Sequence, residues 1–191
     1  MTEVATQRFI DNITSITPGA LKGGILSVSR RPRHEKEKRM SKVPPDTPGA
    51  KPQPYDEVLL AGSDGVPKIY MIHREKKRVI GDDFNKVKDF EAMPGRIYAG
   101  CFNKDGTLFA VGSSVQENGQ AKGEARVYNA ADGKRVSTFE GIKSPVYTVA
   151  FAPDGKSVAV AGFDGMVRLH DPTTGKLIKE FAPAPVATAS R

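Results

Sequence analysis

Short apolar runs separated by turn signals dominate the C-terminal part of the chain. Four such runs lie between residues 144 and 181, and each ends in a turn. The runs cover residues 146–151, 158–161, 167–170 and 176–181. Asp154-Gly155 and Asp164-Gly165 are strong hairpin signals, because the turn needs a positive φ that glycine adopts without steric cost. The pattern predicts one four-stranded antiparallel sheet.

The same order of runs and turns occurs twice more. Residues 97–139 repeat it closely, except that residues 113–122 lengthen one hairpin. A looser copy begins at residues 24–29 and resumes over 58–90. A unit of about 40 to 45 residues that recurs along a chain is typical of architectures in which each unit packs against its neighbours. The sequence therefore predicts an all-β protein built of three such sheets.

Motifs within these units resemble those of the WD40 repeat family, whose signatures are F-S-P-D-G, G-S-x-D-G and W-D. The corresponding elements here are Phe151-Ala-Pro-Asp154-Gly155, Gly62-Ser-Asp64-Gly65 with Gly162-Phe-Asp164-Gly165, and His170-Asp171. The resemblance covers roughly residues 20–183. It implies a β-propeller in which each sheet is one blade.

The chain departs from the family's pattern in two respects. It has no tryptophan, and Tyr70, Tyr128 and His170 stand at the family's Trp position. No Gly-His pair precedes any first strand. The family's buried His–Asp network is therefore not expected here, and Asp64 and Asp164 are expected to serve only their turns.

The resemblance leads to WD40-like β-propeller blades, about three in number, in an open arc. Blade 1 is expected at about 20–91, blade 2 at about 94–140, blade 3 at about 144–182, an outer strand of a missing blade at 6–13, and a tail at 183–191. Blade 1 contains an insertion rich in proline and charge at 31–54. This insertion is predicted to be disordered, because it cannot bury enough apolar surface to offset the entropy of ordering.

An arc of three blades would leave apolar end faces in water. Closed propellers have about 4 to 8 blades, and exposed apolar faces of this size seek partners. We therefore expect the chain to be a piece of a longer propeller. The alternative is that two or more copies assemble into a closed ring.

Charge is concentrated in two stretches of the chain. The formal net charge is +7 at pH 7. Residues 30–42 hold seven basic and two acidic residues, and residues 74–78 hold four basic and one acidic. The remaining chain is nearly neutral, so the basicity belongs to loops. Such runs are usually solvated, although phosphate binding is an alternative.

Composition limits the class of protein. With 191 residues and 38% hydrophobic content, the chain lacks an apolar run of the roughly 18 residues that a membrane helix needs. The first ten residues do not resemble a secretory signal, so the compartment stays open. The single cysteine, Cys101, lies in a predicted inner strand and is expected to be a small buried hydrophobe.

No catalytic, cofactor or metal motif is found. The C-x-x-C-H, H-E-x-x-H, G-x-S-x-G and P-loop patterns are all absent. His34, His73 and His170 are far apart in sequence, and packing is the favoured role for His170. The oxygen donors Asp82, Asp83 and Asn85 match no calcium loop, so a polar turn is the better interpretation.

The sequence thus favours a non-enzymatic scaffold that binds a protein or peptide. Candidate partner-binding residues are Lys68, Arg126, Arg168, Arg30, Arg31 and Arg33. The first three recur at the same position of the predicted third strands. Their alternative role is to face solvent and separate apolar neighbours. The other three begin the basic insertion, where nucleic-acid binding is a further alternative; no aromatic residue interleaves that run to stack on bases.

A narrower resemblance supplies the remaining alternative function. The repeats look like those that accompany c-type cytochrome domains in some bacterial proteins. This resemblance implies an accessory propeller of an exported parent protein, whose haem domain would lie outside this chain.

Overall fold

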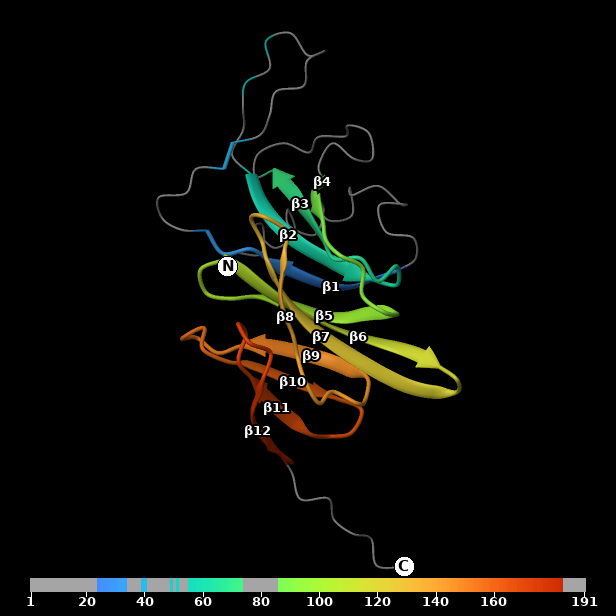
Figure 1. The fold of residues 1–191 in the computed structure, drawn as a ribbon. Helices are drawn as coiled ribbons and strands as arrows, with labels where there is room; N and C mark the ends of the chain where they lie inside the picture. Colours follow the sequence, from blue (N-terminus) through green and yellow to red (C-terminus); the bar gives the residue numbers. More distant parts are fainter. Residues whose placement is uncertain are drawn as a thin grey trace, which may run out of the picture.

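The computed structural model describes residues 24–33, 39–40, 49, 51, 55–73 and 86–183. These residues form three antiparallel sheets of four strands each, and they contain no helix (Figure 1). The first sheet contains β1 (Ile25–Arg30), β2 (Tyr55–Gly62), β3 (Lys68–His73) and β4 (Lys86–Asp89). The second contains β5 (Arg96–Phe102), β6 (Leu108–Glu117), β7 (Gln120–Asn129) and β8 (Arg135–Thr138). The third contains β9 (Val146–Phe151), β10 (Val158–Gly162), β11 (Val167–His170) and β12 (Leu177–Phe181).

Strands follow one another in chain order within every sheet. The first strands lie side by side, because β5 contacts β1 on one side and β9 on the other. Figure 1 shows the three sheets as successive layers, with the third sheet farthest from the first. The predicted all-β fold of three sheets in an open arc is confirmed. The predicted strand at 6–13 and the tail beyond residue 183 lie outside the described residues.

Hairpin turns have the geometry that the Asp-Gly pairs predict. Gly155 has a φ of 72° and Gly165 a φ of 71°, a region that favours glycine. Residues 113–122 lengthen the β6–β7 hairpin as expected, and both of its strands have ten residues. Asn118 and Gly119 form the tip with φ values of 52° and 75°. This hairpin extends beyond the other two sheets in Figure 1.

Alternate side chains of each sheet bury themselves against the two neighbouring sheets. In β6, Phe109 and Val111 belong to the cluster shared with the first sheet, whereas Ala110 belongs to the cluster shared with the third. Gly112 also faces the third sheet, since a Cβ placed there would lie 2.3 Å from Cγ1 of Val146. The period of two along a strand therefore makes the second sheet apolar on both faces.

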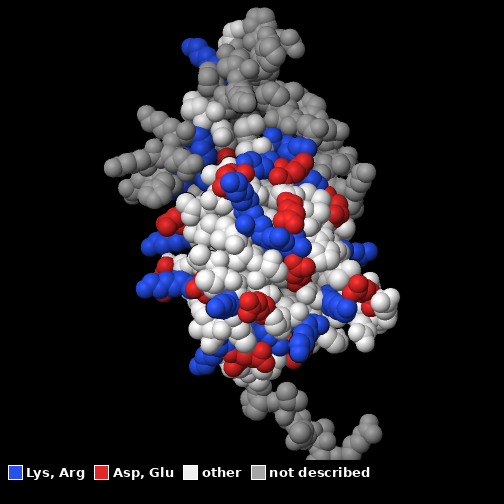
Figure 2. Space-filling view, viewed as in Figure 1, with Lys and Arg blue, Asp and Glu red and all other residues white. Residues whose placement is uncertain are grey.

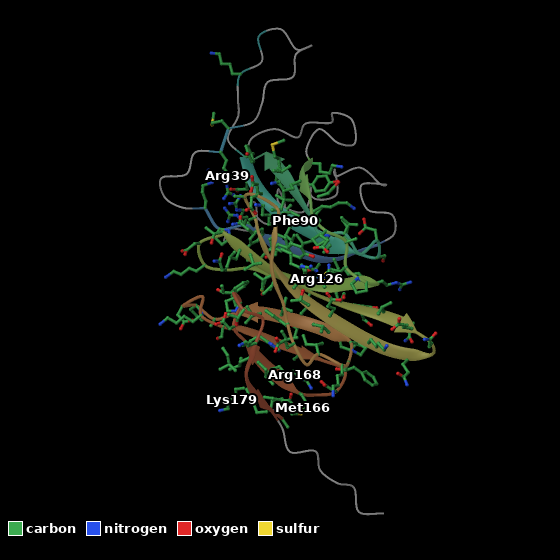
Figure 3. The ribbon with its side chains drawn as sticks, viewed as in Figure 1. Arg39, Phe90, Arg126, Met166, Arg168 and Lys179 are labelled. Carbon is green, nitrogen blue, oxygen red and sulfur yellow. The ribbon has the colours of Figure 1, made fainter. Side chains whose placement is uncertain are left out.

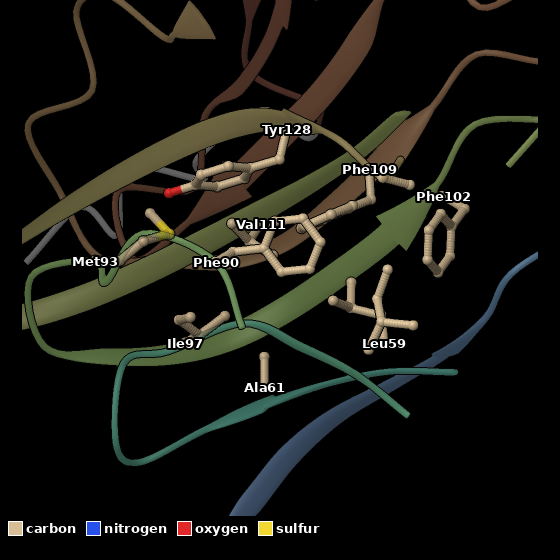
Figure 4. Packing of buried hydrophobic residues seen from close by; sticks show 11 residues of the cluster. Leu59, Ala61, Phe90, Met93, Ile97, Phe102, Phe109, Val111 and Tyr128 are labelled. Atoms are coloured by element: carbon tan, nitrogen blue, oxygen red, sulfur yellow. The ribbon is translucent and has the colours of Figure 1, made fainter. Parts of the chain in front are cut away.

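Aromatic rings join each sheet to the next at equivalent positions. Phe90, just after β4, packs edge-on against Phe109 and Tyr128, with ring centroids 4.6 and 5.8 Å apart (Figure 4). Phe139, just after β8, stacks flat on His170 at 4.6 Å. Tyr128 and His170 are fully buried. They fill the position at which the resembling family carries tryptophan, and the predicted packing role of His170 is confirmed.

Polar atoms of these two rings reach the backbone. The Tyr128 hydroxyl donates to the carbonyl oxygen of Glu91 at 3.0 Å. His170 Nδ1 lies 3.2 Å from the carbonyl oxygen of Gly175. The Nε2 atom of His170 is buried and has no hydrogen-bond partner in the described part of the chain. Protonation of His170 would therefore place an unpaired N–H and a charge in an apolar core.

The ring contacts predict that the same substitution, Phe→Ala, lowers the free energy of unfolding by different amounts at two equivalent positions. Phe139→Ala should lower the free energy of unfolding by about 3 to 5 kcal/mol, because it leaves a cavity beside His170. Phe181→Ala should cost about 0.5 kcal/mol, because Phe181 occupies the equivalent position with 39% of its surface exposed. Urea unfolding of the two variants measures the difference. Equal losses would contradict the idea that the rings stabilise through the sheet-to-sheet contact.

His170 predicts a pH-dependent stability. Burial lowers the pKa of His170, Arg168 lowers it further, and the Gly175 carbonyl and Glu140 oppose the shift. A histidine with a lowered pKa in the folded state binds fewer protons than the unfolded chain as pH falls through about 6.5. Stability should therefore fall from pH 7.5 to 5.5, by at most about 1.4 kcal/mol per pH unit from this group.

The matched variant His170→Phe keeps a flat ring and removes the titrating group. Its Tm should vary less between pH 7.5 and 5.5 than that of the wild-type protein. An identical pH dependence of Tm in the two proteins would show that the burial of His170 does not control stability between pH 7.5 and 5.5.

Candidate functional site

The three recurring cations of the third strands are almost buried. Lys68 and Arg126 are each 8% exposed, and only 11% of the Arg168 side chain is exposed. In Figure 3, Arg126 and Arg168 lie in successive layers of the arc. The alternative role of solvent-facing spacing is therefore excluded for these three residues, because each side chain turns along its own sheet toward a carboxylate.

Each of these cations has an acidic partner close in sequence. Lys68 pairs with Asp64, and Arg126 pairs with Glu124. Arg168 lies 2.7 Å from Asp164 and 2.9 Å from Glu180. Their charges are thus largely compensated inside the protein. A role of these residues in partner binding stays a prediction.

Turn aspartates do more than shape their turns. Oδ1 of Asp64 accepts from the backbone N–H of Val66, and Oδ1 of Asp164 accepts from that of Met166, both at 3.1 Å. The second oxygen of each carboxylate pairs with Lys68 or Arg168. Partial burial would raise the pKa of Asp164, but the hydrogen bond from Arg168 and that from the Met166 backbone hold it below its usual range. The expectation that these two residues serve only their turns is wrong.

In the second sheet a glutamate, and not an aspartate, compensates the charge of the recurring cation. Arg126 has no aspartate four residues earlier, and Glu124 takes that place. Nη1 of Arg126 also donates to the carbonyl oxygen of Ala92 at 2.9 Å. This bond ties β7 to the link between the first and second sheets. Arg126 therefore stabilises the junction between the two sheets.

Arginines at the start of the basic insertion are anchored to β2. Arg31 lies 2.5 Å from Glu57, and its Nε donates to the carbonyl oxygen of Gly106 in the second sheet at 2.6 Å. Arg30 and Arg33 both pair with Asp56, at 3.2 and 3.0 Å. Residues 31–33 are thus held in place, so the prediction that the insertion at 31–54 is disordered is wrong for these three residues. Most of the insertion lies outside the described residues.

Charges of both signs are mixed on the surface. On the face seen in Figure 2, lysines and arginines lie among aspartates and glutamates over the described residues, without a broad area of one sign. The basic loop at 74–78 lies outside the described residues. The face in view therefore does not have the basic stripe that binds nucleic acid.

Candidate chemical groups do not come together in the described structure. No cluster of three or more His, Cys, Asp or Glu residues that could hold a metal occurs in the described ranges. Cys101 is half-buried, and burial raises the pKa of its thiol. His34, Asp82, Asp83 and Asn85 lie outside the described residues. Within those ranges no helix is long and apolar enough to cross a membrane.

A row of large side chains that are exposed or half-buried lies along the first strands. In β1, β5 and β9 the register shifts at the same place, which leaves Leu26, Tyr98 and Tyr147 outside the ladder. Leu26 and Tyr147 are 43% and 47% exposed. The rings of Tyr98 and Tyr147 meet edge to face at 5.5 Å across two sheets. Bulges of this kind redirect side chains and are frequent beside functional sites.

Phe163 extends this row at the turn between β10 and β11. It is 74% exposed, and its backbone N–H donates to the carbonyl oxygen of Pro145 at 3.0 Å. That bond places Phe163 beside the link that leads into Tyr147. We call Leu26, Tyr98, Tyr147 and Phe163 the aromatic rim. Sequence reasoning missed it, although a large residue follows Ile25, Ile97 and Val146 near the start of each first strand.

One comparison with known families matches a segment in the C-terminal half of the chain. A family model described as "WD domain, G-beta repeat" matches residues 133–171. This range includes β8 of the second sheet and β9 to β11 of the third. Neither this match nor the relative below bears on the narrower resemblance to cytochrome-linked repeats.

One relative matches part of the chain. The protein named "Eukaryotic translation initiation factor 3 subunit I" from Danio rerio is 45% identical over 49 residues. These residues are 26% of this chain and only 15% of the relative's length. The repeat match agrees with three sheets of four strands each, whose Asp-Gly turns and buried rings recur at equivalent places. Residues 133–171 are thus similar to a WD40 repeat, and the three sheets of the described structure are consistent with WD40-like blades.

Proposed function

We propose that the protein is a non-enzymatic scaffold that binds a protein or peptide partner at the aromatic rim. The observation that carries this proposal is the repeated bulge, which aims Leu26, Tyr98 and Tyr147 away from the sheet ladders. Rigid sheets hold these side chains in place, and functional residues are often presented in this way by a stable framework.

The chemistry of the rim suits a partner with apolar side chains. Exposed tyrosine and phenylalanine rings bury much area on binding and lose little conformational entropy. Binding hot spots are enriched in tyrosine. The cations Lys68 and Arg168 are paired with Asp64 and Asp164. These ion pairs would help to orient a bound partner and would add little net charge.

Nucleic-acid binding through the insertion has less support. The candidates Arg30, Arg31 and Arg33 already pair with Asp56 and Glu57. A phosphate would have to compete with these carboxylates. Protein binding at the rim requires no such exchange.

The name of the relative agrees with a role in an assembly. It is called a subunit of an initiation factor, and a subunit has protein partners by definition. We propose by analogy that this chain also acts inside a larger complex. The proposal includes our expectation that the three sheets belong to a larger propeller, with self-association of copies as the alternative.

Substitutions in the rim should weaken partner binding. Tyr147→Ser and Phe163→Ser should each reduce capture of the partner from a cell extract by about tenfold or more, because loss of a hot-spot ring costs at least about 2 kcal/mol. Quantitative affinity capture with the full chain measures this loss. The fold should remain intact, since both side chains are largely exposed.

The matched control is Ile178→Ser on the outer strand β12. Ile178 is 58% exposed and lies far from the first strands in its sheet, so this variant should retain the captured partner. Equal loss in all three variants, or no partner at all, would contradict binding at the rim. Binding that survives the rim variants but falls steeply with salt would indicate nucleic acid instead.

A further inference from the structure

Each outer strand carries one aliphatic side chain at a bulge. The register shifts at the same place in β4, β8 and β12, which leaves Val87, Val136 and Ile178 outside the ladders. These three residues are 41%, 36% and 58% exposed. We call Val87, Val136 and Ile178 the aliphatic belt. The belt is separate from the first strands that carry most of the aromatic rim, because outer and first strands lie at opposite edges of each sheet.

Contacts between successive sheets connect the three strands of the belt. Nζ of Lys88 in β4 donates to the carbonyl oxygen of Ala131 at 2.5 Å, in the turn that leads into β8. Oγ of Ser137 in β8 donates to the carbonyl oxygen of Pro172 at 2.6 Å, in the turn that leads into β12. Figure 1 shows β8 between β4 and β12. The outer strands therefore present one connected surface.

Basic residues outnumber acidic ones along this surface. The outer strands and the residues that flank them contain six basic and two acidic residues, over 86–90, 134–139 and 176–181. Lys134 and Lys176 are exposed, and within the described ranges their side chains form no ion pair. Positive charge is thus available beside the aliphatic side chains.

The two acidic residues of the outer strands already have cationic partners. The carboxylate of Asp89 lies 3.0 Å from the ammonium group of Lys86. The carboxylate of Glu180 lies 2.9 Å from the guanidinium group of Arg168. Neither acid therefore compensates the charge of Lys134 or Lys176.

Protection of free sheet edges explains only part of this pattern. Bulges and lysines on an edge strand hinder its pairing with another sheet, and the outer strands have both. An aliphatic side chain at the bulge adds nothing to that protection and leaves apolar surface in water. Its recurrence at the same bulge of all three sheets indicates contact with another molecule.

We propose that the aliphatic belt binds an acidic segment of a partner protein, in which aliphatic residues alternate with aspartate or glutamate. Aliphatic side chains of the segment contact Val87, Val136 and Ile178, and its carboxylates pair with Lys134 and Lys176. Complementary charge speeds the encounter and fixes the register of such a segment. The inference goes beyond the proposed function, because the aromatic rim takes no part in this contact.

A lipid surface of uniform negative charge fits the belt less well. Asp89 and Glu180 are exposed on the outer strands, and a membrane that covered the belt would face both carboxylates. A protein segment can place its acids at the lysines and neutral residues at these two positions. Charge complementarity therefore favours a protein segment as the occupant.

A labelled synthetic peptide tests the proposal with the full chain. The probe alternates glutamate and valine over about 16 residues, which span about 50 Å when extended. A second probe has lysine in place of every glutamate. Fluorescence anisotropy at about 100 mM salt should show that the acidic probe binds at least about tenfold more tightly than the basic one.

Variants of the belt should weaken binding of the acidic probe. Val136→Thr and Ile178→Thr should each lower the affinity about threefold to tenfold, because an apolar contact is lost. Threonine keeps the branch at Cβ and so suits the strand. Lys134→Glu and Lys176→Glu should each lower the affinity about fivefold or more, because attraction becomes repulsion.

The matched controls carry the same changes away from the belt. Val28→Thr in β1 and Lys156→Glu in the β9–β10 turn should leave the affinity for the acidic probe unchanged. Tyr147→Ser in the aromatic rim should also leave it unchanged, so that loss of partner capture at the rim tests the proposed function alone.

Three results would overturn the proposal. In the first, the acidic probe binds no better than the basic probe. In the second, the belt variants and the control variants lower the affinity equally, which indicates unspecific attraction. In the third, the belt variants leave peptide binding unchanged but abolish binding to vesicles that contain phosphatidylserine, because a membrane would then be the occupant.

Discussion

Contact between the flat faces of successive sheets is the interaction on which this structure depends. A four-stranded sheet of about 40 residues buries too little apolar surface to be stable alone. Alternation of side chains gives the second sheet two apolar faces, and the rings Phe90 and Phe139 cross from one sheet to the next. Every sheet of the described structure thus buries an apolar face against a neighbour.

Paired charges replace a hydrogen-bond network that is absent from this sequence. Since no histidine precedes the first strands, the turn aspartates have a second carboxylate oxygen without its usual family partner. Lys68 and Arg168, each four residues after its aspartate, form an ion pair with that oxygen. Nearly buried ion pairs give modest net stability, but removing one partner is costly. These cations therefore belong first to the architecture of each sheet, and any contact with a partner is made beside them.

Two kinds of surface follow from the same repeat. The bulge in each first strand places Leu26, Tyr98 and Tyr147 outside the ladders, which makes a rim for partners. The face that carries Phe181 has the chemistry of a sheet-to-sheet contact. The rim in the third sheet is on the first strand β9, whereas Phe181 ends the outer strand β12 at the opposite edge.

The local pattern was enough to predict the class of fold. Asp-Gly turns set φ at Gly155 and Gly165, and the alternation of apolar residues defined the strands, because both depend on neighbours within a few positions. The long β6–β7 hairpin and the packing role of His170 were also readable from the alignment of one repeat with another. What the sequence could not reveal depends on residues that are distant in the chain.

Only the tertiary structure decided where the charges and exposed rings lie. Nothing local shows that Arg31 reaches Gly106, or that Tyr98 meets Tyr147 from the next sheet. The sequence determined which residues alternate and where the chain turns, since strand geometry is a short-range property. The packing of one sheet on another determined which of those residues remain available to a partner, because burial depends on the neighbours that folding brings together.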